Sequence, residues 1–264
     1  MQSDVPATAV RPPTTRVTVV VPTYNERENI ERLVPQLLAL NIGPAHLAVC
    51  IVDDHSPDGT GEFADQLASS EPREEVVHRS GKLGLGTAYV AGMRHALSSG
   101  ADAVLTMDAD FSHHPRYIPA MVTALSSADL VIGSRYVPGG QVLYPFHRRL
   151  LSRGANAFAR LTLGLRPNDC TAGFRLYRSR VLNSISLEQI FSNGYSFLIE
   201  MLFEVQCRGW RVSEVPIVFE DRRYGESKIS KNEITKAIYT CMRLLARRLA
   251  GRTLHANTDI LRSE

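Results

Sequence analysis

Short, continuously apolar runs alternate with longer amphipathic segments through the first half of the chain. We expect strands at 16–21, 47–52, 76–77, 103–107 and 130–132. Between them, apolar residues recur at helical spacing, which predicts helices at about 33–40, 61–69 and 87–97 and after Pro115. Strands that are apolar on both faces and alternate with helices are typical of a parallel sheet covered on both sides. The pattern therefore predicts a doubly wound α/β domain with right-handed crossovers.

The pattern becomes less regular beyond Gly140. It predicts helices at 147–165, 196–207 and about 232–250, and strands at 174–177 and 215–219. We expect one domain over 16–250, with a first part at about 16–140 and a second at about 141–250. A leader at 1–15, rich in Pro, Thr and Ala, is expected to be disordered, and 251–264 is expected to form a tail.

Composition narrows the class of protein. The net charge of +3 over 264 residues is too small to imply nucleic acid. The four cysteines form no CxxC pair and no zinc spacing, which favours free thiols in a reducing cytosol. The N-terminus lacks the pattern of a signal peptide, and no apolar run approaches the ~18 residues that span a bilayer. We expect a cytoplasmic protein that is soluble or peripherally attached to a membrane.

Two carboxylates follow the apolar run at 103–107. If the strand persists, Asp108 and Asp110 point the same way, because side chains alternate along a strand. Ligands of open α/β sheets bind beyond the carboxyl ends of strands. Hard oxygen ligands at that place suit Mg²⁺ or Mn²⁺ that carries phosphate oxygens. The alternative is that Asp-x-Asp is a common turn tripeptide.

Loops at 22–26, 52–60 and 108–115 each follow a strand and carry acidic or polar residues. In a doubly wound sheet all three project from the same edge, which suggests a nucleotide crevice. Tyr24 could stack on a base, and Asp54 or Glu26 could accept hydrogen bonds from base or ribose. Ordinary Asx turns and helix caps would explain the same residues without a ligand.

Other motifs leave two interpretations open. The glycine-rich turn at 81–86 could bind an anion at a helix N-terminus or be a flexible connection. It matches neither a nicotinamide-dinucleotide motif nor a Walker motif. We interpret His113 and His114 as structural rather than as metal ligands.

Cationic residues gather in the second half. Arg135 ends a strand, and Arg222 and Lys228 flank a glycine-containing loop. Such residues would stabilise a diphosphate leaving group as it gains charge, unless they are simply solvated. The helices at 147–165 and about 232–250 are basic and amphipathic. They suit an anionic membrane surface, although the apolar stripes could instead pack on the core.

These motifs together resemble a known family. The stretches at 21–30, 52–60 and 107–115 are similar to family 2 glycosyltransferases of GT-A fold. Those at 169–177 and 222–228 resemble dolichol- or polyprenol-phosphate mannose synthases. The resemblance covers about residues 16–245. It implies transfer of mannose from GDP-mannose to a polyprenyl monophosphate, with inversion to the β-linked lipid phosphosugar. The first part of the domain would then bind the nucleotide, and the second would face the acceptor and the membrane.

The resemblance also implies roles for individual residues. The nucleotide pocket would be lined by Pro22, Tyr24, Glu26, Val52 and Asp54. The donor diphosphate would be held at Asp108, Ala109 and Asp110, with Mg²⁺ or Mn²⁺ on the two carboxylates. Donor or acceptor phosphates would be bound by Arg135, Arg222 and Lys228, and the catalytic set would comprise these three and Asp110. Arg148 and Ser152 would assist the acceptor phosphate. Ser112 stands where some relatives carry a metal-assisting Gln.

Many relatives append transmembrane helices, which this chain lacks. We therefore expect it to reach its lipid at the cytoplasmic face of a membrane, through surface helices or a separate membrane-anchoring protein. Two alternatives remain. One is a polyprenyl-phosphate glucosyl- or aminosugar-transferase. The other is a membrane-surface adaptor that kept the fold and lost catalysis, against which the intact residues Asp108, Asp110, Arg222 and Lys228 argue.

Overall fold

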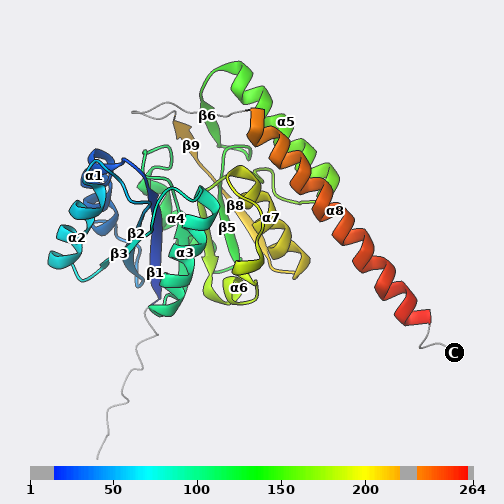
Figure 1. Ribbon diagram of the computed structural model, residues 1–264, viewed down its shortest axis with the longest axis horizontal. Helices are drawn as coiled ribbons and strands as arrows, with labels where there is room; N and C mark the ends of the chain where they lie inside the picture. Colours follow the sequence, from blue (N-terminus) through cyan, green and yellow to red (C-terminus); the bar gives the residue numbers. More distant parts are fainter. Residues whose placement is uncertain (1–14, 221–230, 261–264) are drawn as a thin grey trace, which may run out of the picture.

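The computed structural model describes residues 15–220 and 231–260, with side chains of the last helix described over 234–250. Residues 1–14 of the predicted leader, and Arg222 and Lys228, lie outside the described residues. Helices and strands alternate as expected for a mixed α/β protein (Figure 1). Among the described residues, no helix is long and apolar enough to span a membrane.

The central sheet has seven strands in the order β3-β2-β1-β4-β7-β5-β8. All neighbours pair in parallel except β7, which runs antiparallel to both β4 and β5. The strands are β1 (Arg16–Thr23), β2 (His46–Asp53), β3 (Glu74–His78), β4 (Ala103–Thr106), β5 (Leu130–Ser134), β7 (Arg175–Arg178) and β8 (Val212–Pro216). The predicted doubly wound α/β domain is therefore confirmed, with a sheet that is parallel except at β7.

A second, two-stranded sheet pairs β6 (Gln141–Leu143) with β9 (Val218–Glu220). The sequence pattern missed β6, and the single strand predicted at 215–219 is wrong. The chain leaves the main sheet after Pro216, at the end of its pairing with β5, and the following residues pair with β6 instead. One continuous apolar run thus serves two sheets.

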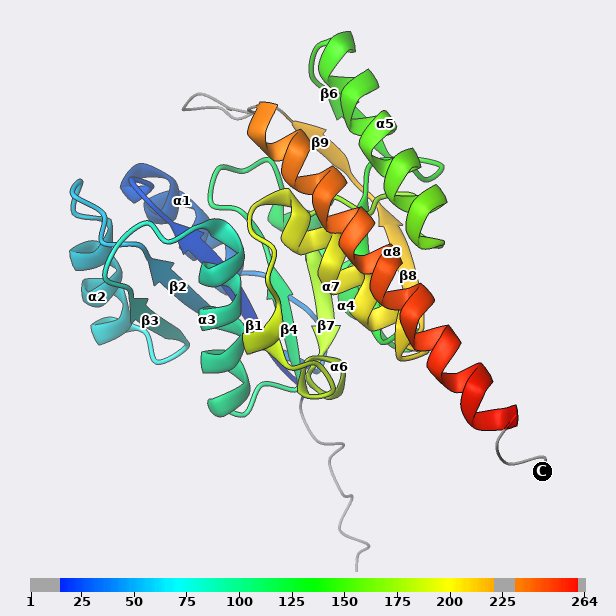
Figure 2. The same ribbon diagram turned by 45° about the vertical axis from the view of Figure 1, so that its right-hand side comes forward.

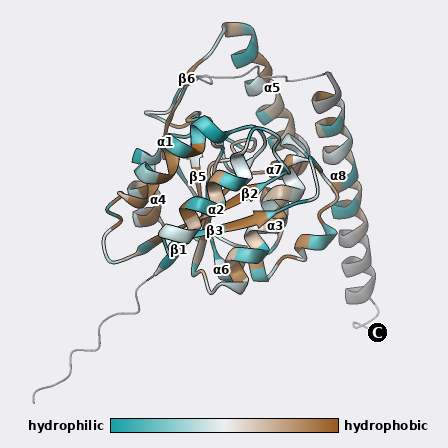
Figure 3. Cartoon of the chain, turned by 60° about the vertical axis from the view of Figure 1, so that its left-hand side comes forward, coloured by the Kyte–Doolittle hydropathy of each residue, from teal (hydrophilic) through white to brown (hydrophobic). Residues whose placement is uncertain are grey.

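Helices cover both faces of the main sheet (Figures 1 and 2). Along β1, Val17, Val19 and Val21 pack toward one core with α1 and α4, whereas Val20 packs toward a second core with α3 and α7. In Figure 3, β2 is mostly brown, as expected for a strand whose residues after His46 are all buried. The helical segments are α1 (Arg27–Leu38), α2 (Thr60–Ser70), α3 (Leu85–Ser98), η1 (Pro115–Tyr117), α4 (Ile118–Ala124), α5 (Phe146–Leu163), α6 (Ser179–Asn183), η2 (Leu187–Gln189), α7 (Tyr195–Cys207) and α8 (Lys231–Ile260).

The two basic amphipathic helices, α5 and α8, lie side by side at one end of the molecule (Figures 1 and 2). α8 continues to Ile260 rather than ending near residue 250. Part of each apolar stripe packs on the core, because Ala159 and Leu163 on α5 and Cys241 on α8 are fully buried. The core-packing interpretation is therefore correct for these residues, while other apolar side chains of both helices stay exposed.

Close contact between α3 and the sheet depends on Gly92. A Cβ atom there would lie 2.3 Å from Val20 Cγ1 and 2.8 Å from Val52 Cγ2. We expect Gly92→Ala to lower the free energy of unfolding by ~1–3 kcal/mol through overpacking. A Cβ atom added at Gly154 on α5 would meet only open space. Gly154→Ala should therefore raise the free energy of unfolding by ~0.5–1 kcal/mol. Urea denaturation measures both changes, and equal stability of the two variants would contradict the packing argument.

Candidate active site

Three loops at one edge of the sheet share an uncommon backbone conformation. They follow β1, β2 and β4, which are neighbours in the sheet. Among the described residues, Asn25, His55 and Phe111 are the only non-glycine residues with positive φ, at 60°, 60° and 62°. Each lies in a different one of these loops. Such a conformation costs ~1–3 kcal/mol and often occurs where a binding site requires it. The backbone therefore marks this edge as the candidate site.

The first two loops are fastened to each other by hydrogen bonds. Buried Asp53 accepts from the Ser56 N–H at 3.0 Å, and Ser56 Oγ accepts from the Asn25 N–H at 3.0 Å. The Thr60 hydroxyl oxygen accepts from the Glu26 N–H at 3.1 Å. Hydrogen bonds within the loops therefore explain the presence of Asp53 and Ser56 without a ligand, which was one of the two interpretations of the sequence. Its effect is to fix the positions of Glu26 and its neighbours.

An ion pair that the sequence did not reveal holds Asp54. Arg79 Nη1 donates to Asp54 Oδ1 at 2.7 Å, with both side chains less than one tenth exposed, and Arg79 Nη2 donates to Thr87 Oγ1 at 2.6 Å. Burial raises the pKa of Asp54, and the charge of Arg79 opposes that shift. Arg79 directly follows β3, which ends at His78. The strand-end rule applied to the other loops would have found Arg79 had it been extended to this weak strand.

Tyr24 and the glycine-rich turn come together beside this pair. Lys82 Nζ lies 4.2 Å from the centroid of the Tyr24 ring, and Tyr24 as a residue is 36% exposed. Pro22 and Val52 are direct partners in the β1–β2 register. The Val52 side chain, however, is fully buried in the core against α3. Val52 can therefore reach a ligand only through its backbone, whereas Tyr24 offers an accessible ring.

The two carboxylates after β4 differ in environment. β4 ends at Thr106, so the expected strand geometry at Asp108 and Asp110 is wrong, and both lie in a loop. The Asp108 carboxylate is 30% exposed and accepts a hydrogen bond from Tyr89 Oη at 2.8 Å. Asp110 is almost buried, and its Oδ1 accepts from the Ser112 N–H at 3.0 Å. The hydrogen-bonded loop, not the strand, therefore orients the carboxylates.

His113 supports this loop from below. It is buried, stacks on Phe174 at 5.2 Å between ring centroids, and accepts at Nδ1 from the Asp108 N–H at 3.3 Å. Burial lowers the pKa of His113, which favours the neutral ring that can accept this bond. Neighbouring His114 accepts from the Arg116 N–H instead. Both histidines thus make structural contacts, in keeping with the sequence interpretation.

Arg135, which follows β5, is anchored by a buried carboxylate. Its Nε and Nη2 donate to the two oxygens of Asp169 at 2.7 and 2.6 Å, and its N–H donates to the same carboxylate at 3.0 Å. Asp169 is fully buried. Burial alone would raise the pKa of Asp169, but Arg135 holds it below its usual value. Because β7 is antiparallel, the segment that precedes it lies at the edge where β4 and β5 end.

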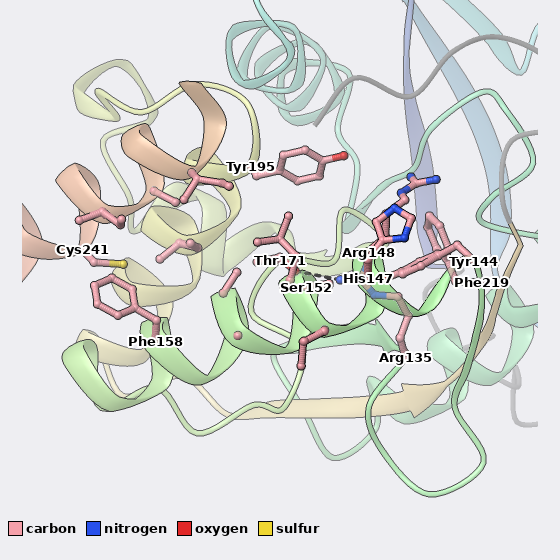
Figure 4. Close-up of a pocket in the computed structure, with 18 residues that line it drawn as sticks. Arg135, Tyr144, His147, Arg148, Ser152, Phe158, Thr171, Tyr195, Phe219 and Cys241 are labelled. Carbon is pink, nitrogen blue, oxygen red and sulfur yellow. Dashed lines mark hydrogen bonds between the residues drawn. The ribbon is translucent and has the colours of Figure 1, made fainter. Parts of the chain in front are cut away.

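A cavity of about 630 Å³ lies beside Arg135, between α5, α7 and α8 (Figure 4). We call it the α5–α8 cavity. Polar groups meet at one end, where Arg135, Arg148 and Ser152 contribute to its wall. Its apolar wall comes from Leu150, Leu151, Ala155, Phe158, Ile199, Ile234, Ala237 and Ile238. The space can therefore hold a molecule with an anionic head and an apolar chain.

Aromatic rings join the polar end of this cavity to the acidic loop. Phe219 on β9 lies 5.4 Å from the His113 ring centroid, and the Arg135 guanidinium carbon lies 5.3 Å from the Phe219 centroid. Ser152 Oγ accepts from Tyr136 Oη at 2.7 Å, which fixes it at the cavity wall. The structure thus brings Arg135, Ser152 and the acidic loop into one region, although they are distant in sequence.

Comparison with known proteins decides the family. The model of glycosyl transferase family 2 matches residues 18–186. The chain belongs to glycosyl transferase family 2. The family prediction is confirmed, and the chain is a glycosyltransferase.

Two curated relatives resemble this glycosyltransferase over most of its length. An undecaprenyl-phosphate mannosyltransferase from Micrococcus luteus is 44% identical over 229 residues, which cover 86% of this chain and 93% of the relative. A polyprenol monophosphomannose synthase from Mycolicibacterium smegmatis is 46% identical over 235 residues, which cover 86% of each chain.

The solved structures support the GT-A fold. Glucosyl-3-phosphoglycerate synthase from Mycobacterium tuberculosis, in complex with Mn²⁺, UDP and glucosyl-3-phosphoglycerate, superposes with a TM-score of 0.61 at 23% identity. The match covers 91% of this glycosyltransferase and 86% of that chain. At this identity the likeness concerns the fold alone.

The acidic loop of this glycosyltransferase fits a divalent cation. Within the described residues, no three His, Cys, Asp or Glu side chains form a metal-binding group. Asp108 and Asp110 nevertheless supply the hard oxygens that Mg²⁺ and Mn²⁺ prefer, and such ions take further ligands from substrate phosphates and water. Beside them, Ser112 Oγ is buried without a hydrogen-bond partner. Ala109 is also buried, and its methyl side chain has no ligand atom, so only its backbone could contact a diphosphate. The donor set suits a cation shared with a diphosphate.

Proposed function

We propose that this glycosyltransferase transfers mannose from GDP-mannose to a polyprenyl monophosphate, with inversion at the anomeric carbon. The α5–α8 cavity carries the proposal. It joins a cationic end at Arg135 to a long apolar wall, and that end adjoins the acidic loop of the donor site. The names of the two curated relatives support mannose as the sugar and a polyprenyl phosphate as the acceptor.

The acceptor needs positioning more than activation. A phosphate monoester, whose second pKa is ~6, is already anionic near neutral pH. In the proposed reaction, one of its oxygens bonds to the anomeric carbon from the face opposite the diphosphate. The bond between that carbon and the diphosphate oxygen breaks at the same time, and GDP leaves. Arg135, Arg148 and Ser152 would hold the acceptor phosphate at the polar end of the cavity, while Arg222 and Lys228 would contribute charge to the phosphates.

The donor would occupy the loops after β1, β2 and β4. Tyr24 presents its ring to the base, and Asp54 accepts from a base N–H. Asp108 and Asp110 would hold Mg²⁺ or Mn²⁺, which when bound supplies Lewis acidity at the donor diphosphate. Pro22 and Glu26 complete the nucleotide pocket in this proposal.

Transfer of labelled sugar tests the proposal. Purified protein is incubated with Mn²⁺, a polyprenyl phosphate and one radiolabelled nucleotide sugar at a time. We expect label to enter the organic phase from GDP-mannose, and the product to be the β-anomer by NMR. Label from UDP-glucose alone would favour the glucosyltransferase alternative. No transfer from any donor would favour the adaptor that lost catalysis.

Arg79 tests the donor half separately. We expect Arg79→Met to raise the Kd for GDP about tenfold, a loss of ~1.4 kcal/mol, because buried Asp54 loses its cationic partner and its fixed orientation. Isothermal titration with GDP and Mg²⁺ measures the change. Arg73→Met is the matched control, because Arg73 pairs with Glu71 at the exposed surface. An unchanged Kd for Arg79→Met would show that this ion pair does not contribute to nucleotide binding.

We also propose that the surface formed by β6, α5 and α8 contacts an anionic membrane. Most of the large apolar side chains that stay exposed in the described residues lie there: Leu143, Phe146, Leu150, Leu151, Phe158, Leu161, Ile234, Ile238, Tyr239, Met242 and Leu249. Arg149, Arg153, Arg160 and Arg243 add positive charge on the same helices. Apolar side chains with basic neighbours suit the interface of an anionic bilayer. A protein so placed would be peripheral, as the sequence suggested, with or without an anchoring partner.

Leu161 tests this surface, because it is 85% exposed. We expect Leu161→Glu to lower the affinity for anionic vesicles, measured by cosedimentation, about 10–100-fold, since inserting the leucine contributes ~1.5–3 kcal/mol. Leu83→Glu, at a 58% exposed leucine of the glycine-rich turn, is the control and should bind vesicles as the unchanged protein does. Equal losses in both variants would contradict the assignment of the surface.

A further inference from the structure

The segment Asn168–Thr171 holds Arg135 at the wall of the α5–α8 cavity. Asp169 accepts three hydrogen bonds from Arg135, and Arg135 Nη2 also donates to Thr171 Oγ1 at 2.8 Å. Asn156 on α5 holds the C-terminal end of the segment, where its Nδ2 donates to Thr171 Oγ1 at 3.2 Å. The direction of the Arg135 guanidinium therefore depends on where this segment lies.

Glu214 on β8 holds the N-terminal end of the segment. Its Oε2 accepts from the Asn168 N–H at 2.9 Å and from Asn168 Nδ2 at 3.1 Å. Its Oε1 accepts from the Asp169 N–H at 3.0 Å. Two consecutive backbone N–H groups thus converge on one carboxylate, and each of its oxygens is used. Glu214 is not among the residues that line the α5–α8 cavity.

We propose that Glu214 is a positioning residue for the transfer reaction, which acts on the acceptor phosphate through Asp169 and Arg135. This rests on the proposed function in so far as Arg135 contacts that phosphate. A bidentate guanidinium–carboxylate pair has a fixed geometry, so displacement of Asp169 displaces the guanidinium with it. Glu214 fixes the backbone from which the Asp169 carboxylate extends.

The presence of a carboxylate at residue 214, despite its cost beside Asp169, favours a positioning role over a merely stabilising one. Fully buried Arg175, on β7, contacts the segment, because its Nη2 donates to the Cys170 carbonyl oxygen at 2.7 Å. A second carboxylate near Asp169 is unfavourable by itself. A neutral residue would avoid that repulsion. Only a carboxylate, however, offers two equivalent acceptor oxygens to the N–H groups of Asn168 and Asp169. Glutamine keeps one oxygen and turns an N–H₂ group toward the other N–H.

A substrate-free measurement tests the geometry. The ¹⁵N–¹H signal of Arg135 Nε is assigned by its loss in Arg135→Lys. We expect this signal to shift and to exchange faster with solvent in Glu214→Ala, and less so in Glu214→Gln. Ser213→Ala, the neighbouring position on β8, is the control and should leave it unchanged. An unaltered Arg135 signal in both Glu214 variants would overturn the proposal. Should Glu214→Ala fail to fold, Glu214→Gln decides.

Kinetics test the consequence. We expect Glu214→Ala to lower kcat/KM for the acceptor by roughly 10–100-fold, since small misplacements of a binding group have effects of that size. The Kd for GDP should stay within about twofold of that of the unchanged protein, because the donor loops are untouched. In an Arg135→Met background, Glu214→Ala should cause little further loss. A full additional loss there would show that Glu214 does not act through Arg135.

The two proposals fail in different ways. If Arg135→Met transfers sugar normally, Arg135 has no role at the phosphate, while the Nε signal still reports whether Glu214 positions it. If sugar transfer depends on Arg135 but not on Glu214, the proposed function stands and the positioning role is wrong.

Discussion

Asp108→Asn is expected to lower the rate constant of sugar transfer about 10³-fold. A loss of this size corresponds to ~4 kcal/mol of transition-state stabilisation, within the range ascribed to a bound divalent cation. Asparagine is nearly isosteric and keeps an acceptor oxygen for Tyr89 Oη, so the loop should hold its conformation. Transfer is measured at saturating GDP-mannose over a range of Mg²⁺ and Mn²⁺ concentrations.

A control variant tests whether the loss of any carboxylate would lower the rate of sugar transfer. Asp65→Asn removes a carboxylate on α2 that is 56% exposed and lies 2.9 Å from Nε2 of His78 on β3, and this variant should transfer sugar normally. Asp110→Asn should resemble Asp108→Asn. A normal rate and a normal metal dependence in Asp108→Asn would remove Asp108 from the metal assignment.

Arg135→Met should lower the free energy of unfolding by ~3 kcal/mol near neutral pH. The change leaves Asp169 fully buried without its cationic partner, and breaking a buried pair by removing one member typically costs this much. Arg73→Met, which breaks an exposed pair, should cost less than ~1 kcal/mol. Urea denaturation of both variants measures the difference.

The pH dependence of that loss has a definite sign. Arg135 holds the folded-state pKa of Asp169 below the value of 3.8 expected when unfolded. The pair therefore stabilises the protein fully above that unfolded value, and its contribution is lost as pH falls through the lower folded value. In Arg135→Met the pKa of Asp169 should rise, so protonation relieves the unpaired charge. The deficit should accordingly shrink as pH falls toward 4, and a deficit that is constant between pH 7.5 and 4 would contradict the buried-charge explanation.

Local pattern predicted most of the main sheet and the three strand-end loops of the candidate site. The runs that became β1, β2, β4 and β5 are continuously apolar, and the rule that ligands bind at strand ends then located Tyr24, Asp54 and Asp108. The direction of β7 was not predictable, because an apolar run has the same pattern whichever way it is inserted. The helices and the large core thus follow from periodicity, whereas the order of the strands does not.

Long-range pairs account for what the sequence missed in the site. Arg79 and Asp54 are 25 residues apart, and Arg135 and Asp169 are 34 apart. No local spacing connects them, and only the sheet brings them together. The carboxylates at 108 and 110 follow β4, as the apolar run before them indicated. Their orientation was not predicted, because hydrogen bonding to Tyr89 and Ser112 replaces the strand after Thr106.

The place of β7 makes the protein indivisible. β5 lies within the part predicted to bind the nucleotide, yet its partners β7 and β8 both come from beyond residue 170. A fragment that stops at residue 140 would leave β5 without a neighbour and one side of β4 unpaired, and such open edges promote aggregation. During synthesis, the sheet of residues 16–140 therefore cannot be completed until β7 and β8 have been made. A donor module and an acceptor module of this protein could not be exchanged as separate pieces.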